Sequence, residues 1–292
     1  MTVLVTGATG YIGGRLAARL VADGYDVHLL VRPQSDTTQL RNLAAHIHPC
    51  PDTCRDSIST IVRTVRPSII FHLAAARSTD PVEAMIDANL RLGVMLTEGL
   101  LAAGGGRLVN TGTWWQFNAY GGYEPNGPYA VTKQAFQDLL RFYGERKELR
   151  ATTLVLYDVY GENDPRKRLM WHLLRASHGE TVALTSGLQQ IRLCHVDDVV
   201  EAYLVAANGL AMGEFPPCVF VGEPAVHSVR EIAEVFMTIL GRPLDLRWAA
   251  IPSRPRTPQR PCPVDPALPG WQSRVSVESG VRRLLTREGL IG

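Results

Sequence analysis

The stretch Thr6-Gly7-Ala8-Thr9-Gly10-Tyr11-Ile12-Gly13 decides the fold. It follows an apolar run at residues 3–5, which predicts a short buried strand, and it precedes a helical pattern over residues 15–22. A strand that turns through three spaced glycines into a helix is typical of nucleotide-binding α/β folds, because the glycines permit the tight turn, the approach of a pyrophosphate and close helix–strand packing. The helix N-terminus then directs its N–H groups at the phosphates. We predict cofactor contacts from Gly7, Thr9, Gly10, Tyr11, Ile12 and Gly13.

Length and composition place the chain among ordinary globular proteins. Its 292 residues are enough for one large domain or one and a half, and its hydrophobic content of 46% is typical. The net charge of +2 does not favour a polyanionic partner, and no apolar run reaches transmembrane length. The N-terminus, which enters a strand directly, does not resemble a signal peptide. We therefore predict a cytoplasmic protein with neither nucleic-acid nor membrane partners.

The cysteines give no sign of a disulfide framework or a metal centre. Five cysteines at irregular spacing indicate a reducing compartment. Cys50 and Cys54 lie close together, but no second pair of Cys or His has the spacing of a zinc site. The sequence analysis predicts no metal.

Arg32 directly follows a second predicted strand, over residues 25–31. In this fold the end of that strand meets the adenosine ribose, where a carboxylate binds the 2′-hydroxyl and an arginine accommodates a 2′-phosphate. Arg32 therefore favours NADP(H), with NAD(H) as the alternative. The nearby carboxylate, Asp36, lies past Pro33 in a loop. Asp52, in a third strand-and-exit segment at residues 41–52, is a candidate for the adenine edge.

Strands and helices alternate through the first half. A helix at residues 57–65 and a strand at 69–73 lead to small side chains on which a cofactor can lie, so Leu73, Ala74 and Ala75 are predicted contacts. His72, at the end of a buried strand, is interpreted as structural. The remaining elements are a helix at residues 81–103, a strand at 107–110, a helix at 129–148 and a strand at 152–156. This alternation predicts a Rossmann-type, doubly wound parallel sheet.

The second half is less regular and predicts a smaller substrate-binding lobe. We place the cofactor domain at residues 1–160, with its core continuing through 190–210, and the lobe at 161–292. A helix is expected to open at residues 164–166, a strand to cover 190–196, and Asp197 and Asp198 to begin a helix that runs through 207. To the smaller part we assign residues 216–221, a helix at 229–240 and the proline-rich run at 252–269.

Tyr129 and Lys133 form the second informative pattern. Four residues apart on a helix, they share one face. A tyrosine with a pKa near 10 is a poor acid–base catalyst at neutral pH, and a neighbouring ammonium is expected to lower that pKa. Thr113, beyond a strand end, is placed to hydrogen-bond the same substrate oxygen; Thr111 is the competing candidate. The predicted catalytic residues are Thr113, Tyr129 and Lys133, and the last two also contact the cofactor.

These residues resemble the extended short-chain dehydrogenase/reductase family, the NAD(P)-dependent sugar epimerase/dehydratase group, nearly end to end. Asn89 and Gly93 match its helix signature, and residues 195–198 and 268–271 are similar to its C-terminal markers. The resemblance implies that Tyr129 is the acid/base, that Lys133 holds the nicotinamide ribose and that Thr113 binds the reacting oxygen. It further implies nicotinamide contacts from Tyr157, Val159 and Tyr160, and a homodimer formed through the helices at 81–103 and 129–148.

Departures from the family pattern narrow the expected activity. Sugar-nucleotide 4,6-dehydratases carry Asp and Glu after the catalytic Thr, whereas this chain has Trp114 and Trp115. The arginine that grips the diphosphate in most epimerases is Ile191 here, so Arg192 or Arg166 is the candidate. Residues 111–116, 157–158 and 163–166 look most like CDP-abequose synthase-like NDP-4-keto-6-deoxyhexose 4-ketoreductases. Predicted substrate contacts are Thr113, Trp114, Trp115, Gln116, Asp158, Arg166 and Arg192.

The sequence thus predicts an NADPH-dependent 4-ketoreductase acting on a nucleotide-linked deoxysugar. A 4-epimerase, which returns the hydride to the opposite face of the sugar and usually holds NAD, is the first alternative. A non-enzymatic NADP-sensing regulator on the same fold is the second, and the Tyr129–Lys133 pair speaks against it.

Overall fold

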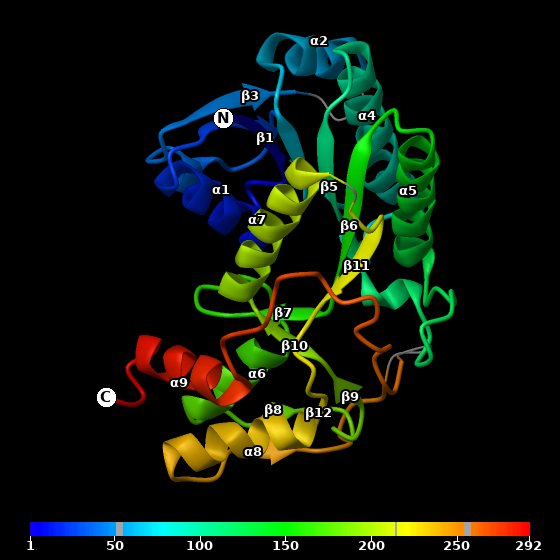
Figure 1. Cartoon of the computed structure of the whole chain (residues 1–292). Coiled ribbons are helices and arrows are strands. Elements are labelled where there is room, and N and C mark those ends of the chain that lie inside the picture. The colour runs from blue at the N-terminus through cyan, green and yellow to red at the C-terminus, as the bar shows by residue number, and fades with distance from the viewer. Residues whose placement is uncertain (51–54, 214, 254–257) are drawn as a thin grey trace.

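A seven-stranded parallel sheet forms the centre of the part of the chain that this computed structural model describes, which is residues 1–292 without 51–54, 214 and 254–257. Its order is β11-β6-β5-β4-β1-β2-β3, and the chain crosses over after β3, as in a doubly wound fold (Figure 1). The strands are β1 (Thr2–Thr6), β2 (Asp26–Val31), β3 (Ala45–Pro49), β4 (Ile69–His72), β5 (Arg107–Thr113), β6 (Arg150–Leu156) and β11 (Cys218–Val221). The predicted fold class is confirmed.

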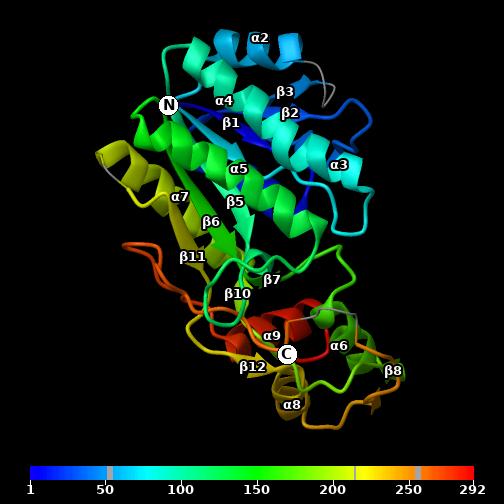
Figure 2. The same ribbon diagram turned by 90° about the vertical axis from the view of Figure 1, so that its right-hand side faces the viewer.

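Helices cover both faces of this sheet (Figure 2). Along β1, Val3 and Val5 pack with the helices of one face, while Leu4 packs with those of the other. This alternation explains why β1 reads as a continuous apolar run. The first face carries α1 (Tyr11–Ala22) and α7 (Val196–Met212). The second carries α2 (Arg55–Val65), α3 (Val82–Ile86), the π-helical segment η2 (Asp87–Arg91), α4 (Leu92–Ala102) and α5 (Pro128–Glu145).

A second core gathers the helices of the C-terminal lobe, below the carboxyl ends of the central strands in Figure 1. Leu173, Phe236 and Leu284, one from each helix, are buried together there. The lobe's helices are α6 (Leu169–Ser177), α8 (Val229–Leu240) and α9 (Val277–Arg287). Its short strands pair as β7 (Asp158–Tyr160) with β10 (Leu193–His195), β8 (Val182–Ala183) with β13 (Leu246–Arg247), and β9 (Gln190–Ile191) with β12 (His227–Ser228).

The element predictions hold best in the first half and fail in places in the second. Residues 216–221, assigned above to the smaller part, instead supply β11, which pairs with β6 at the edge of the central sheet. The helix expected to open at 164–166 begins at Leu169, because Asp164 folds back to accept the N–H of Arg166. The strand expected over 190–196 is broken into β9 and β10. Helix α9 was not predicted.

Candidate active site

The glycine turn after β1 forms a cradle with no space for side chains. Gly7 adopts φ +77°, and a Cβ there would lie 2.6 Å from the backbone N of Ala74. A Cβ on Gly13 would lie 2.2 Å from the carbonyl oxygen of Gly7, so α1 packs directly on the turn. Gly10 precedes α1 without a side-chain cap, and the first turn of α1 carries no acidic residue. The exposed N–H groups of this helix start therefore suit a dinucleotide pyrophosphate.

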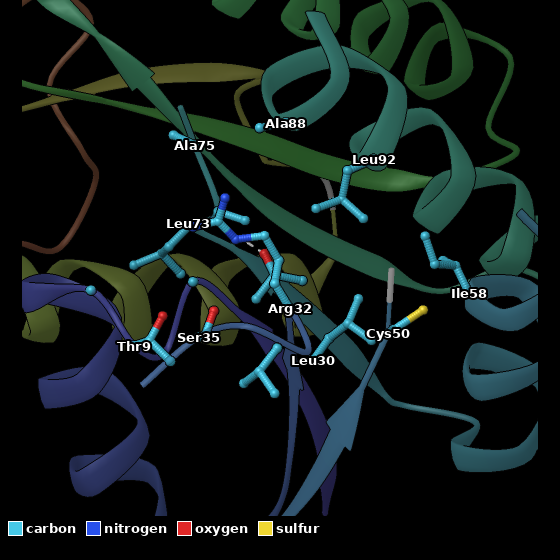
Figure 3. Close-up of a pocket in the computed structure, with 15 residues that line it drawn as sticks. Thr9, Leu30, Arg32, Ser35, Cys50, Ile58, Leu73, Ala75, Ala88 and Leu92 are labelled. Atoms are coloured by element: carbon cyan, nitrogen blue, oxygen red, sulfur yellow. Dashed lines mark hydrogen bonds between the residues drawn. The ribbon is translucent and has the colours of Figure 1, made fainter. Parts of the chain in front are cut away.

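A pocket of about 300 Å³ opens beside this turn. Arg32, just past β2, is the only charged residue among the described residues that line it, and its side chain lies beside Leu73 (Figure 3). This arrangement fits an adenosine ribose that carries a 2′-phosphate. Of the predicted cofactor residues, Gly7, Thr9, Gly10, Arg32, Leu73, Ala74 and Ala75 line the pocket. Asp52 lies outside the described residues.

Tyr11 connects the glycine turn to the second half of the chain. Its hydroxyl donates to the carbonyl of Glu162 over 3.2 Å, and the guanidinium of Arg166 lies 4.8 Å from its ring centroid. Ile12 packs against the core on the α1 side of the sheet. Neither residue is in the set that lines the Arg32 pocket, although both were predicted to contact the cofactor.

Lys133 is buried one turn along α5 from Tyr129. It is 1% exposed, and this burial lowers its pKa to about 8. Its ammonium also adds to the burial effect that lowers the pKa of His72 to about 3. His72 is fully buried with Nδ1 2.8 Å from the Thr6 hydroxyl, which confirms its structural interpretation. Lys133 therefore lies near the end of β4, next to the loop that lines the cofactor pocket.

Tyr129 is partly buried at the start of α5, and its ring meets Trp115 edge to face at 6.3 Å. Burial raises the pKa of Tyr129, and the guanidinium of Arg168 opposes this rise. In the chain by itself the effect of burial prevails, and the charge that opposes it is Arg168. The expected lowering of this pKa by Lys133, aided by a cationic nicotinamide ring, stays a prediction for the cofactor complex. The phenol is thus fully protonated at neutral pH.

Asn89 holds these segments together from the π-helical segment. Its side-chain carbonyl accepts the backbone N–H of Ala76 over 3.0 Å, and its amide donates to the Thr132 hydroxyl over 2.9 Å. The loop after β4 and the residue preceding Lys133 are thereby fixed to one buried side chain. A π-helical turn commonly marks a functional site, and here it directs Asn89 between the two segments.

The two threonine candidates have different surroundings. Thr111 donates to the carbonyl of His72 over 2.8 Å, and its oxygen lies 2.7 Å from the Tyr203 hydroxyl. Thr113 caps the short helix η3 (Trp114–Gln116), accepting the N–H of Trp115 over 3.4 Å. That contact leaves the proton of Thr113 for another acceptor, so the geometry favours Thr113 for binding a substrate oxygen.

Tyr203 is a site neighbour that the sequence analysis missed. It lies on α7, is fully buried, and touches Thr111 as described; Tyr129 contributes to raising its pKa. No local pattern marks Tyr203, because α7 reaches the site only through its packing on the central sheet.

A second pocket, of about 540 Å³, lies in the lobe. Asp158, Val159, Tyr160 and Arg166 from our predictions line it, together with Arg168. Burial raises the pKa of Asp158, and Arg168, whose Nη1 is 3.7 Å from its carboxylate, opposes this. Arg166 forms a two-pronged ion pair with Asp164 over 2.7 and 2.6 Å and donates to the Val159 carbonyl. The pocket is therefore lined by arginines together with carboxylates that pair with them.

Four residues that were predicted to contact a ligand line neither of these two pockets, and their side chains lie inside the protein. Trp114 is 5% exposed and stacks on Tyr157, whose hydroxyl donates to the Pro263 carbonyl over 2.7 Å. Gln116 is fully buried, accepting the N–H of Thr113. Arg192 donates to the carbonyls of Glu223 and Pro224. These four side chains therefore pack behind the site, and their hydrogen bonds are made within the protein, although Nε of Arg192 has no partner among the described residues.

Known proteins share this fold. The model of the NAD dependent epimerase/dehydratase family matches residues 3–216, and the chain belongs to that family. It is an NAD(P)-dependent enzyme, which sets aside the regulator alternative.

Individual relatives are similar over most of their length. CDP-abequose synthase of Yersinia pseudotuberculosis is 29% identical over 240 residues, which cover 80% of this chain and 82% of that one. UDP-glucose 4-epimerase of Mycolicibacterium smegmatis is 28% identical, covering 83% and 84%. The structure of Thermus thermophilus UDP-glucose 4-epimerase in complex with NAD aligns with TM-score 0.83 at 23% identity, covering 98% of both chains. In the part of the chain that the structure describes, no helix is long and apolar enough to cross a membrane.

Proposed function

We propose that this protein reduces the C4 ketone of an NDP-4-keto-6-deoxyhexose with NADPH, a step of deoxysugar biosynthesis. The observation that carries the proposal is the position of Arg32, the only charged side chain lining the described part of the cofactor pocket. An arginine at the end of this strand suits NADP(H), the reduced form of which a reductase consumes at each turnover. The similarity to CDP-abequose synthase supports the same substrate class.

The chain's own groups fit proton donation to a developing alkoxide. When bound, NADPH supplies a hydride to the ketone carbon. Tyr129 holds its proton at neutral pH, as any phenol with an ordinary or raised pKa does, and it can give that proton to the developing C4 alkoxide, which is the stronger base. Thr113 would orient the same oxygen through its free hydroxyl proton. Lys133, buried one turn away, would hold the nicotinamide ribose.

The epimerase alternative would use the same residues, with Tyr129 first removing a hydroxyl proton and later returning one. Trp115 beside Tyr129 presents an aromatic edge to the reacting region, which suits the apolar 6-deoxy end of the sugar. In the second pocket the half-exposed Arg168 would face the diphosphate, while Arg166 is held by Asp164.

The exposed apolar side chains of α3 and α5 support a homodimer. The exposed large apolar residues on this helical layer are Val82, Ile86, Val131, Leu139 and Phe142. A second copy that packs its own α3–α5 layer here would cover them.

The test of the function is the loss of reduced-nicotinamide absorbance with CDP-, dTDP- and GDP-linked 4-keto-6-deoxyhexoses, using NADPH and NADH in parallel. We expect consumption with one sugar nucleotide, faster with NADPH, and none with the Tyr129→Phe variant. No consumption with any ketosugar, together with retained NAD and isomerisation of an NDP-sugar, would replace the reductase by the epimerase.

A further inference from the structure

Three of the eight histidines gather with one carboxylate on the outer strands of the central sheet, away from both pockets. Asp26 and His28 are alternate residues of β2, so they share a face, and His46 and His48 are alternate residues of β3. The parallel register places His28 beside His46. Four residues that offer nitrogen or carboxylate ligands therefore meet on one face, near the amino ends of these strands.

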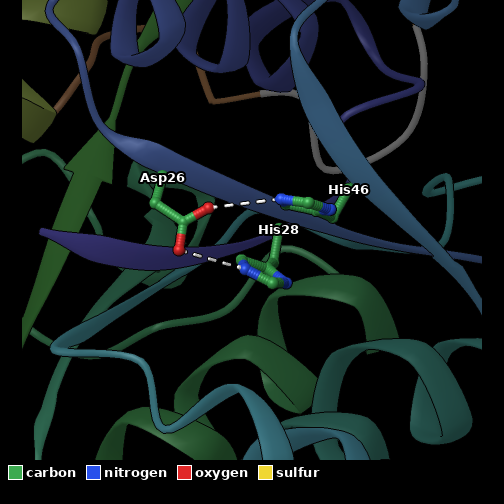
Figure 4. Close-up of side chains that lie close together, drawn as sticks. All are labelled: Asp26, His28 and His46. Carbon is green, nitrogen blue, oxygen red and sulfur yellow. Dashed lines mark hydrogen bonds and ion pairs between the residues drawn. The ribbon is translucent and has the colours of Figure 1, made fainter.

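The distances within this cluster are close to those of a metal coordination sphere. Nε2 of His28 lies 3.4 Å from one Asp26 oxygen, and Nε2 of His46 lies 3.4 Å from the other (Figure 4). The three candidate ligand atoms are all within 4.8 Å of one another. Ligands about 2.0–2.1 Å from a tetrahedral zinc ion are roughly 3.3 Å apart, so small side-chain rotations bring the set to bonding distance.

His48 supplies the support that a coordinating imidazole needs. Its Nε2 lies 2.8 Å from Nδ1 of His28, on the opposite side of the His28 ring from Asp26. If His28 donates its Nδ1 proton to His48, its Nε2 lone pair faces the Asp26 carboxylate. These two electron-rich atoms then lie 3.4 Å apart, an arrangement that a cation between them would stabilise. Metal-bound histidines characteristically donate their second ring N–H to such a partner.

The surroundings also leave the cluster open to an ion. Among the described residues, the recorded partners of the Asp26 carboxylate are Thr2, His28 and His46, and none is a guanidinium or an ammonium. Asp26 and His46 have 48% and 66% of their side chains exposed, so water can reach a remaining coordination position.

A second group, Glu162, His195 and Asp197, has similar spacing but a different charge environment. Arg15 and Arg283 pair with Asp197 over 3.0 and 3.3 Å. Since these guanidinium groups already neutralise the Asp197 carboxylate, this group is the weaker candidate for a metal site.

We propose that Asp26, His28 and His46 bind one divalent transition-metal ion, typified by zinc, with His48 orienting His28 and water completing the shell. The site bridges β2 and β3, the two outermost strands on this side of the sheet. These strands also carry Arg32 and Cys50 at their other ends, so the bound ion would tie together the strands beneath the adenosine end of the cofactor pocket.

Zinc binding to the full-length, metal-stripped enzyme tests the proposal, measured by titration calorimetry and by zinc content after dialysis. We expect one zinc ion per chain. His28→Gln and His46→Gln should each weaken binding by about tenfold or more, and His48→Gln by about tenfold through the lost support. Magnesium should not compete, because it prefers oxygen ligands.

His178→Gln is the matched control, because His178 also faces a carboxylate, Glu288, at 3.3 Å but belongs to neither three-ligand group found among the described residues. Zinc affinity should be unchanged in this variant, and NADPH binding should be unchanged in all of them, which reports that they fold. Absence of zinc binding to the wild-type enzyme, or binding that survives in the His28→Gln/His46→Gln double variant, would overturn the site.

Discussion

The two pockets are built in different ways. The Arg32 pocket is lined mainly by the ends of β1, β2 and β4 and the short segments that follow them, with Ile58, Ala88 and Leu92 added from helices. Most of its lining residues therefore belong to a repeating strand–turn–helix pattern. The lobe pocket draws on β7, α6, β10, α8 and α9, which approach one another only through tertiary packing. Among the described residues, the first pocket has one charged lining residue, whereas the second is lined by both arginines and carboxylates. The comparison teaches that a binding site built from a repeated local pattern can be predicted from sequence, whereas a site assembled by tertiary packing cannot.

Helix α5 joins the two pockets through its first turns. Lys133 helps to lower the pKa of His72, at the edge of the Arg32 pocket. Arg168, which lines the lobe pocket, opposes the rise in the pKa of Tyr129. The reacting atoms of cofactor and substrate would meet between these residues. Variants of this region should therefore separate what each pocket does.

Tyr129→Phe should have the largest effect. Loss of the general acid should lower kcat by roughly 10²- to 10⁴-fold, while the dissociation constant of NADPH changes by less than about twofold. Steady-state kinetics and a fluorescence titration of NADPH measure the two quantities separately. A variant that turns over at a near-normal rate would remove Tyr129 from the mechanism, and equal losses in both quantities would mean that Tyr129 shapes the cofactor pocket instead.

Lys133→Met should stabilise the cofactor-free protein while it impairs turnover. Burial lowers the Lys133 pKa from 10.5 to about 8, so keeping the charge inside costs roughly 3 kcal/mol of folding free energy at pH 7. The unfolded state binds more protons between pH 8 and 10.5, so this cost shrinks as the pH rises through that window.

Urea unfolding at pH 7 and pH 10 checks this expectation. The gain from Lys133→Met should be large at pH 7 and small at pH 10. Lys147→Met, at an exposed position, should change neither value appreciably. A Lys133→Met protein that is less stable than wild type at pH 7 would show that interactions of the ammonium offset the free-energy cost of burying it.

The sequence analysis was most successful where one segment carries both fold and chemistry. The glycine turn predicted β1, α1 and one side of the Arg32 pocket, because a glycine suits the φ of Gly7 and the close approach at Gly13. Tyr129 and Lys133 could be paired because helical spacing is visible in one dimension.

The remaining site residues depended on packing that no local pattern reveals. Trp114 and Trp115 are adjacent, yet Trp114 stacks in the core while Trp115 meets Tyr129. Arg192 was a candidate for binding the diphosphate, but its guanidinium is buried and donates to backbone carbonyls. The alternation of Asp26 with His28 was readable, as was that of His46 with His48, but only the register of β2 and β3 brings these two pairs together.

Arg32→Ala probes the first pocket alone. If Arg32 contacts the 2′-phosphate, its loss should weaken NADPH by roughly 10- to 100-fold, the value of a charge-assisted hydrogen bond, and leave NADH within about twofold. Dissociation constants for both nucleotides decide the point. Arg41→Ala, an exposed arginine in the segment after β2, is the control and should alter neither. Equal weakening of both nucleotides by Arg32→Ala would mean that this residue supports the pocket without reading the phosphate.

Arg168→Gln should have the smallest effect and probes the link between the pockets. Arg168 is half exposed and is the charge that opposes the raised pKa of Tyr129, so its removal should raise that pKa further. A reductase loses activity as rising pH deprotonates its general acid, and the basic limb of kcat should therefore move to higher pH, by less than about one unit because solvent screens an exposed charge. Arg175→Gln is the matched control, since Arg175 lines the same pocket but pairs with Glu180. A basic limb that moves to lower pH, or equally in both variants, would show that Arg168 acts on the substrate alone and that the lobe pocket does not tune Tyr129.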